Sequence, residues 1–180
     1  IAVLTVYNKK NADGFTPGDQ RLLSIIAAQS AQVVENARLY EEEKTLVRLR
    51  SEMDIAAEIQ RDLLPRKAPR IPGYEILGHS IPAEQVGGDY FDYLPLEDGR
   101  LGLAIGDVSG KGMPAALYMA VCRGLLHALA GKHSEPHAAI SDLNAIPCKD
   151  STSPVFITLF YSVLDPATGV LQYCSGGHNL

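Results

Sequence analysis

The sequence is poor in the features that direct a chain to nucleic acid or to a membrane. Its densest basic cluster is Arg66, Lys67 and Arg70, in a chain with a net charge of −5. Phosphate backbones bind larger groups of Lys and Arg than this. No apolar run approaches the roughly 18 residues that a membrane span requires, and no signal peptide is recognisable. We therefore expect no nucleic-acid partner and no membrane span in this chain.

Cysteine is also scarce. Cys122, Cys148 and Cys174 are scattered and form no Cys-x-x-Cys pair, whereas a disulfide framework needs paired cysteines. An unpaired set is typical of the reducing cytoplasm, where such residues pack as small apolar side chains. The content of 46% hydrophobic and 21% charged residues suits one core of ordinary size in 180 residues. We predict a cytoplasmic location.

A long helix is the most prominent feature of the first part of the chain. Residues 1–7 are rich in strand-forming residues and predict a strand. Thr16 and Pro17 then form a helix start, with Thr as the cap and Pro at the first helical position, and Asp19 adds a favourable charge. Nothing interrupts the helix before Pro65. This length far exceeds the ~11–12 residues of an average helix, and it predicts a coiled coil or a linking helix.

Apolar residues recur every seven positions along this helix, in two registers that are one residue out of step. The registers comprise Ile26, Val33, Tyr40 and Val47, and Leu39, Leu46 and Met53. They meet around residues 41–44, where charged residues interrupt the apolar stripe. A coiled coil with such a discontinuity can pack in two ways and so carry a signal. We predict a homodimer through this helix; the alternative is a single helix packed along its own domain.

The pattern after Pro65 is that of an α+β domain. Prolines and Gly73 form a link, and Asp98-Gly99 is typical of a hairpin turn. We expect strands at 74–81, around 90–94, at 100–105, at 155–164 and at 170–174, helices at 113–130 and 136–146, and a loop at 106–112.

Two aspartates have the spacing of a metal site. Asp89 and Asp107 are equidistant from the predicted turn at residue 98, so paired strands place them opposite each other. Two carboxylates that close repel unless a cation bridges them, and oxygen ligands suit Mg²⁺ or Mn²⁺. The alternative is that one or both are turn or cap residues.

The same residues carry a resemblance to a known family. Residues 86–92 read Val-Gly-Gly-Asp-Tyr-Phe-Asp, and residues 103–116 read Leu-Ala-Ile-Gly-Asp-Val-Ser-Gly-Lys-Gly-Met-Pro-Ala-Ala. Phe-Ile-Thr-Leu-Phe-Tyr at 156–161 and Gly-Gly-His-Asn at 176–179 follow. These four blocks resemble SpoIIE/RsbU-type serine/threonine phosphatases of the PPM (type-2C) superfamily, from about Glu58 to the end of the chain.

The resemblance implies a PPM-type β-sandwich flanked by helices, with two Mn²⁺ or Mg²⁺ ions at one edge. Asp89 and Asp107 match the first two metal aspartates of the family, and the backbone carbonyl of Val108 matches a third ligand. Water activated by the ions would attack a phosphoserine or phosphothreonine, without a covalent enzyme intermediate. The usual substrates in this branch are phosphorylated STAS-type anti-anti-sigma factors.

Two departures from the family pattern leave other interpretations open. No histidine follows Asp107 where the wider superfamily often has one, and the remaining metal aspartates of the family lie beyond the Gly-His-Asn block, where this chain ends. A non-catalytic signalling module with a degenerate phosphatase fold that binds a partner is therefore the main alternative. A metal-dependent hydrolase of small phosphoesters is also compatible with these residues.

Several other residues have a functional and a structural interpretation. Asp92 supports the metal ligands or is a solvated strand-end carboxylate. Lys111 binds substrate phosphate or is an exposed loop lysine. We expect His178 to be a turn residue, and we expect no metal binding from three further histidines: His127, His133 and His137.

The N-terminal part resembles another family. Residues 1–10, 15–23 and 25–40 are similar to the last strand and final helix of a GAF sensor domain. The chain begins inside a β-rich run and without Met, which indicates an excerpt of a longer protein. We predict the tail of a GAF domain at 1–16, a signalling and dimerisation helix at 17–65, and a PPM phosphatase domain at 66–180.

Overall fold

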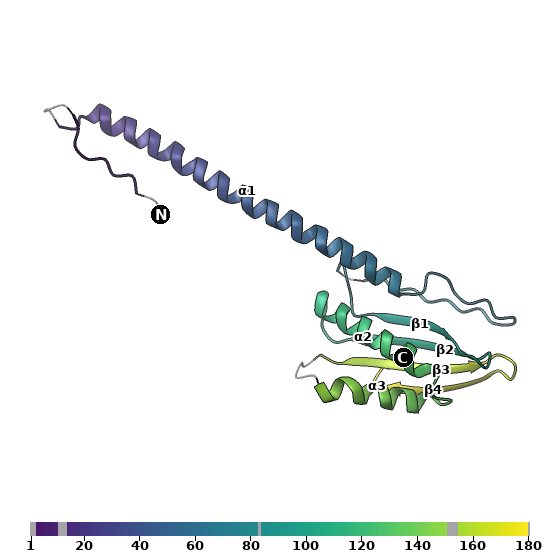
Figure 1. The fold of residues 1–180 in the computed structure, drawn as a ribbon. Coiled ribbons are helices and arrows are strands. Elements are labelled where there is room, and N and C mark those ends of the chain that lie inside the picture. The colour runs from purple at the N-terminus through teal and green to yellow at the C-terminus, as the bar shows by residue number, and fades with distance from the viewer. Residues whose placement is uncertain (1–2, 11–13, 83, 151–154, 180) are drawn as a thin grey trace. The chain divides into compact units, whose positions relative to one another are not determined.

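The structure is a computed structural model that describes residues 3–10, 14–82, 84–150 and 155–179. It divides into two compact units, Ile1–Glu52 and Met53–Leu180, which are described separately. Figure 1 shows the elements. They are α1 (Pro17–Leu63), β1 (Tyr90–Pro95), β2 (Leu101–Val108), α2 (Met113–Ala130), α3 (Pro136–Asp150), β3 (Ile157–Asp165) and β4 (Val170–Gly176).

Helix α1 begins and ends where the sequence predicts. The backbone N–H of Asp19 donates to the Thr16 hydroxyl oxygen at 3.2 Å, and the N–H of Thr16 donates to the Asp19 carboxylate at 2.7 Å. This reciprocal cap satisfies two of the free N–H groups of the first turn. Lys9 also contacts the Asp19 carboxylate. This contact is the largest cause of the lowered pKa of Asp19. The helix ends at Leu63, two residues before Pro65.

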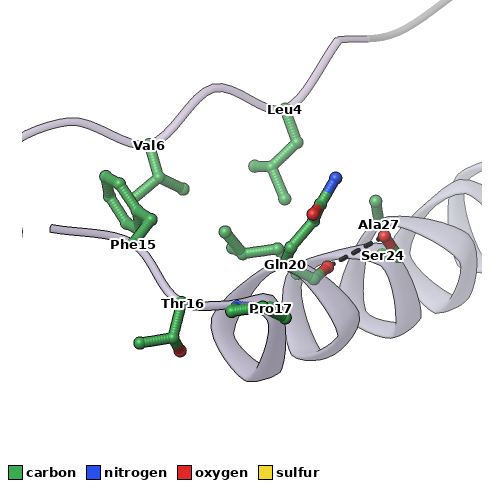
Figure 2. A pocket seen from close by; sticks show the side chains of 9 residues that line it. Leu4, Val6, Phe15, Thr16, Pro17, Gln20, Ser24 and Ala27 are labelled. Atoms are coloured by element: carbon green, nitrogen blue, oxygen red, sulfur yellow. Dashed lines mark hydrogen bonds between the residues drawn. The ribbon is translucent and has the colours of Figure 1, made fainter.

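The predicted strand at 1–7 is wrong for residues 3–7, which form no strand; Ile1 and Ala2 lie outside the described residues. A strand needs a partner for its N–H and C=O groups, and none of the described residues pairs with this segment. Instead Leu4, Val6 and Phe15 lie over the first turns of α1 (Figure 2). They line an apolar pocket of about 490 Å³.

The second unit contains one antiparallel sheet with strand order β1-β2-β3-β4. The predicted hairpin is confirmed: β1 and β2 flank the Asp98-Gly99 turn, and Gly99 has a φ of 81° that favours glycine. Strand β2 runs to Val108, so Asp107 lies within the strand and not in the predicted loop. The reason is the pairing with β3, which aligns Asp107 with Thr158 and Val108 with Ile157.

Helices α2 and α3 cover one face of this sheet, which confirms the α+β class. Helix α2 contacts β1 and β2, and α3 contacts β3 and β4. Tyr90, Tyr161 and Met119 are among the largest fully buried side chains of the core between them. The opposite face carries exposed Ile105, Leu171 and other apolar side chains. The residues described here thus contain one sheet, where the resemblance implies a two-sheet sandwich.

The predicted strand at 74–81 is wrong. Tyr74 makes only an isolated bridge to Ile71, and the segment passes over the side chains of β1 instead of pairing with its edge. A Cβ at Gly78 would lie 2.4 Å from the Phe91 ring and 2.7 Å from the Tyr93 hydroxyl. Close packing on these rings therefore takes the place of ladder hydrogen bonds.

Helix α2 requires a correction to the expectation about membrane spans. It is long and apolar enough, by length and composition alone, to cross a bilayer. In this fold its apolar residues contribute to the core: seven of its side chains are buried, and Met119 and Leu126 are buried completely. Burial also raises the pKa of the Cys122 thiol on this helix to about 12.

Candidate metal centre

Asp89 and Asp107 lie directly opposite each other at one end of the sheet. Tyr90 pairs with Gly106, and the N–H of Val108 donates to the Gly88 carbonyl at 3.3 Å. Asp89 and Asp107 occupy the position between these two hydrogen-bonded pairs. That position is of the closer, non-hydrogen-bonded kind, in which opposing Cβ atoms are about 5 Å apart. Both residues are exposed, and both lie on the sheet face that α2 and α3 leave open.

Gly88 keeps this end of the hairpin free of side chains. A Cβ at Gly88 would lie 2.7 Å from the carbonyl oxygen of Val108, a contact that would force the two strands apart. The glycine thereby allows the two strands to approach closely beside the aspartate pair, where Val108 is itself buried. The site accordingly offers two carboxylates and one backbone carbonyl from adjacent residues.

This donor set fits a hard divalent cation. Carboxylate and carbonyl oxygens suit Mg²⁺ or Mn²⁺, and a cation would relieve the repulsion between the facing carboxylates. Within the described ranges, no group of three or more His, Cys, Asp or Glu side chains is placed to hold a metal. The candidate centre therefore consists of Asp89, Asp107 and the Val108 carbonyl.

Comparisons with known proteins identify similar chains. Residues 97–180 match the family described as Stage II sporulation protein E (SpoIIE). Phosphoserine phosphatase RsbU of Bacillus subtilis is 33% identical over 143 residues, which cover 77% of this chain and 42% of that protein. Protein IcfG of Synechocystis is 29% identical over 156 residues, covering 72% of this chain and 25% of that protein. The chain thus spans less than half of these relatives.

The comparisons support a phosphatase domain of the SpoIIE/RsbU type. A solved structure, the SiaA-PP2C domain of Pseudomonas aeruginosa, has a similar fold, with a TM-score of 0.58 and 19% identity. The structural match covers 73% of this chain and 55% of the SiaA-PP2C chain. RsbU-type and PP2C-type phosphatases are metal-dependent, in accordance with the carboxylate pair described above.

Gln60 joins α1 to the loop that carries Asp89. Its side-chain amide donates to the Gly87 carbonyl at 2.7 Å and accepts from the Gly87 N–H at 3.0 Å. Gln60, Arg61 and Asp89 also line a small pocket of about 110 Å³. Gln60 could not be identified from the sequence, because a polar residue within a helix gives no signal of a contact 27 residues away.

Lys111 is exposed and pairs with Glu84. Its ammonium lies 2.8 Å from the Glu84 carboxylate, and this contact raises the pKa of Lys111. The position agrees with an exposed loop lysine. A role in phosphate binding stays a prediction.

Both interpretations of Asp92 are wrong. Its side chain is 3% exposed and points to the helix-covered face of β1, away from the face of Asp107. It lies 2.7 Å from His127 Nε2 and 3.3 Å from Arg123 Nε, both on α2. It also accepts from the Tyr93 N–H at 2.8 Å and from the Tyr90 hydroxyl at 3.2 Å. Asp92 therefore links β1 to α2 through its contacts with Arg123 and His127.

The remaining histidines behave as structural residues. His127 pairs with Asp92, His133 lies 2.9 Å from Asp142, and His137 lies 3.3 Å from Glu135. His178 follows Gly177, whose φ is 82°, and has no assigned turn, so its role as a turn residue stays a prediction. Its ring also contacts Thr158, a residue that the sequence did not single out although it lies in the Phe-Ile-Thr-Leu-Phe-Tyr block.

Proposed function

We propose that this chain is part of a metal-dependent serine/threonine protein phosphatase, with Asp89, Asp107 and the Val108 carbonyl holding the ions. The observation that carries the proposal is the placement of Asp89 and Asp107 as a directly opposed, exposed pair at the end of the β1–β2 hairpin. The same residues belong to the blocks that resemble the SpoIIE/RsbU family. The name of its relative RsbU, a phosphoserine phosphatase, supports the substrate class.

The chain's own residues have limited but defined tasks in such a reaction. Divalent ions at this site would activate water and neutralise charge on the transferring phosphoryl group. Asp89 and Asp107 supply the negative charge that binds the ions on the exposed face. Gly88 lets its strand lie close to the Val108 carbonyl. The exposure of both aspartates allows a phosphorylated loop of another protein to reach the site.

The substrate that we propose is a phosphorylated STAS-type anti-anti-sigma factor, in the cytoplasm. The support is the family resemblance and the 33% identity to RsbU. Cations at the exposed carboxylates would reduce the repulsion between this acidic chain and a phosphorylated protein.

We further propose that α1 forms a homodimer and transmits a signal from a GAF-type sensor domain. Helix α1 has no buried residue. Apolar residues of the two predicted registers are exposed, among them Val33 (67%), Tyr40 (65%), Leu46 (66%) and Val47 (63%). A second copy of the helix would cover these side chains. Gln60 gives the end of the helix a direct contact with the loop before Asp89.

The test is hydrolysis of a phosphoserine peptide by the full-length protein, with and without Mn²⁺. Manganese-dependent release of phosphate from the peptide supports the proposal. Hydrolysis of small phosphoesters but not of any phosphoserine peptide or phosphorylated STAS domain would favour the small-molecule hydrolase. A folded protein without either activity would favour the non-catalytic signalling module.

The contact between Gln60 and Gly87 leads to a specific prediction. In Gln60→Glu a carboxylate oxygen replaces the amide that donates to the Gly87 carbonyl, so attraction becomes repulsion while size is kept. We expect the Mn²⁺ concentration for half-maximal activity to rise roughly 10-fold, as for other changes in groups that support metal ligands. The measurement is a Mn²⁺ titration of phosphatase activity.

Gln32→Glu is the matched control, because Gln32 is exposed on α1. It should leave the Mn²⁺ requirement unchanged. An unchanged requirement in Gln60→Glu would show that this contact does not support the metal centre.

A further inference from the structure

The Gly-Gly-His-Asn block is held next to the start of β3 by backbone and side-chain contacts. Strand β4 ends at Gly176, and Gly177, with a φ of 82°, turns the chain back to form a parallel bridge with Leu159. The Ser175 hydroxyl donates to the His178 carbonyl at 2.9 Å. These contacts fix the half-buried His178 next to the start of β3.

Thr158 connects His178 to Asp107. Thr158 is the direct partner of Asp107 in the β2–β3 register. Its hydroxyl donates to the Asp107 carbonyl at 3.3 Å, and its oxygen lies 2.9 Å from Nδ1 of His178. Because a hydroxyl has one hydrogen, His178 must donate from Nδ1 in this arrangement. The result is a chain of donors from His178 through Thr158 to the Asp107 carbonyl.

The accepting carbonyl belongs to the peptide unit that joins Asp107 to Val108. That peptide links the two consecutive residues from which the candidate centre takes a carboxylate and a carbonyl. A hydrogen bond to it restrains the plane of this peptide, on either side of which the Asp107 carboxylate and the Val108 carbonyl are attached. Consecutive hydrogen bonds also polarise and strengthen each other, so His178 influences a carbonyl that it does not touch.

We propose that Thr158 and His178 are positioning residues that hold the Asp107–Val108 peptide in the orientation that binds a divalent cation. This inference rests on the metal centre of the proposed function. It assigns a chemical role to the Gly-Gly-His-Asn block. Groups that orient metal ligands typically contribute 10- to 100-fold to metal affinity, and we expect the lower end here because the hydrogen bond goes to a backbone carbonyl.

The test is calorimetric titration of the full-length protein with Mn²⁺ alone. Thr158→Val keeps the shape and the strand preference but removes the hydroxyl, and His178→Leu removes the ring donor. We expect each to weaken Mn²⁺ binding roughly 10-fold. Thr158→Ser keeps the hydroxyl, and in His178→Asn the side-chain amide nitrogen takes the place of Nδ1; both should bind Mn²⁺ within about 2-fold of the natural protein.

A second measurement distinguishes a positioning role of Thr158 and His178 from a purely structural one. Without metal, Thr158→Val and Thr158→Ser should unfold at similar temperatures, and so should His178→Leu and His178→Asn. The Mn²⁺ affinities should differ within each of these pairs. Equal Mn²⁺ affinities in Thr158→Val and the natural protein would overturn the inference and leave the metal centre intact. Absence of Mn²⁺ binding by the natural protein would overturn the metal centre and the inference together.

Discussion

Replacing Asp107 by Asn should abolish the phosphatase activity of the full-length protein while leaving its fold intact. The amide has the shape of the carboxylate but lacks its charge, so the pair that faces the proposed ions loses half of its negative charge. Metal-ion catalysis contributes several kcal/mol to such reactions, and each 1.36 kcal/mol corresponds to tenfold in rate. We therefore expect a loss of roughly 1,000-fold or more in Mn²⁺-dependent phosphate release from a phosphoserine peptide.

The fold should survive because Asp107 is exposed at the end of its strand. Without metal, Asp107→Asn should even be slightly more stable, since it removes repulsion between two facing carboxylates. Thermal unfolding in the presence of a chelator would measure this. A variant that unfolds in this assay would show that Asp107 has a structural role that the exposed side chain does not indicate.

Asp98→Asn is the matched control for this prediction. Asp98 lies in the turn at the other end of the same hairpin, where its carboxylate accepts from the Arg100 N–H at 3.1 Å and from Arg100 Nε at 2.7 Å. Asn can still accept from the backbone, and the site is remote from Asp89. Activity should therefore remain close to that of the natural protein. Full activity of Asp107→Asn would show that the metal assignment is wrong.

The parts of the fold that could be predicted are those with local signals. The cap at Thr16 and Asp19 marks the start of α1, and Pro65 marks its end within two residues. The turn at Asp98 and Gly99 fixes the hairpin register, and this register alone places Asp89 opposite Asp107. Each of these features depends on residues that are close in sequence or symmetric about one turn.

The two wrong strands show the limit of such signals. Segments 3–7 and 74–81 have the composition of strands, but composition does not state whether a free edge is available for pairing. Gly78, in the second segment, packs on the side chains of β1 and the segment makes no ladder with this strand, whereas β2 extends to Val108 because it pairs with β3. Pairing partners, and not propensity, decided both outcomes.

The contacts around the site could not be predicted from the sequence because their partners are far apart along the chain. Gln60 bonds Gly87 from 27 residues away, His127 contacts Asp92 from 35 residues away, and Thr158 bonds the Asp107 carbonyl from 51 residues away. Each residue type is common in ordinary helices or strands. Only the register of the sheet and the position of the helices reveal these partners.

The largest effect on stability should come from replacing Asp92 by Ala. Its carboxylate is almost completely buried and has contacts with Tyr90, Arg123 and His127. Burial, and next the Asp92 charge, raise the pKa of Tyr90, so the tyrosine hydroxyl stays protonated and donates to Asp92. Removing the carboxylate leaves this hydroxyl, the Arg123 guanidinium and the His127 ring without their common acceptor.

Breaking a fully buried ion pair costs about 3–5 kcal/mol. His127 and Arg123 keep partial contact with water, at 39% and 27% side-chain exposure, so we expect about 2–3 kcal/mol for Asp92→Ala, a loss of roughly 10 °C in Tm for a unit of this size. Asp92→Asn keeps the shape and one acceptor oxygen and should cost about half as much. Denaturant unfolding of the full-length protein, followed at the second unit, measures both.

Asp142→Ala is the matched control, because Asp142 also pairs with a histidine but is 57% exposed. An exposed pair contributes little, so this variant should stay within about 0.5 kcal/mol of the natural protein. If Asp92→Ala were equally mild, the contacts of Asp92 would not be what holds α2 on the sheet. The apolar side chains around Met119 would then hold the helix in place without it.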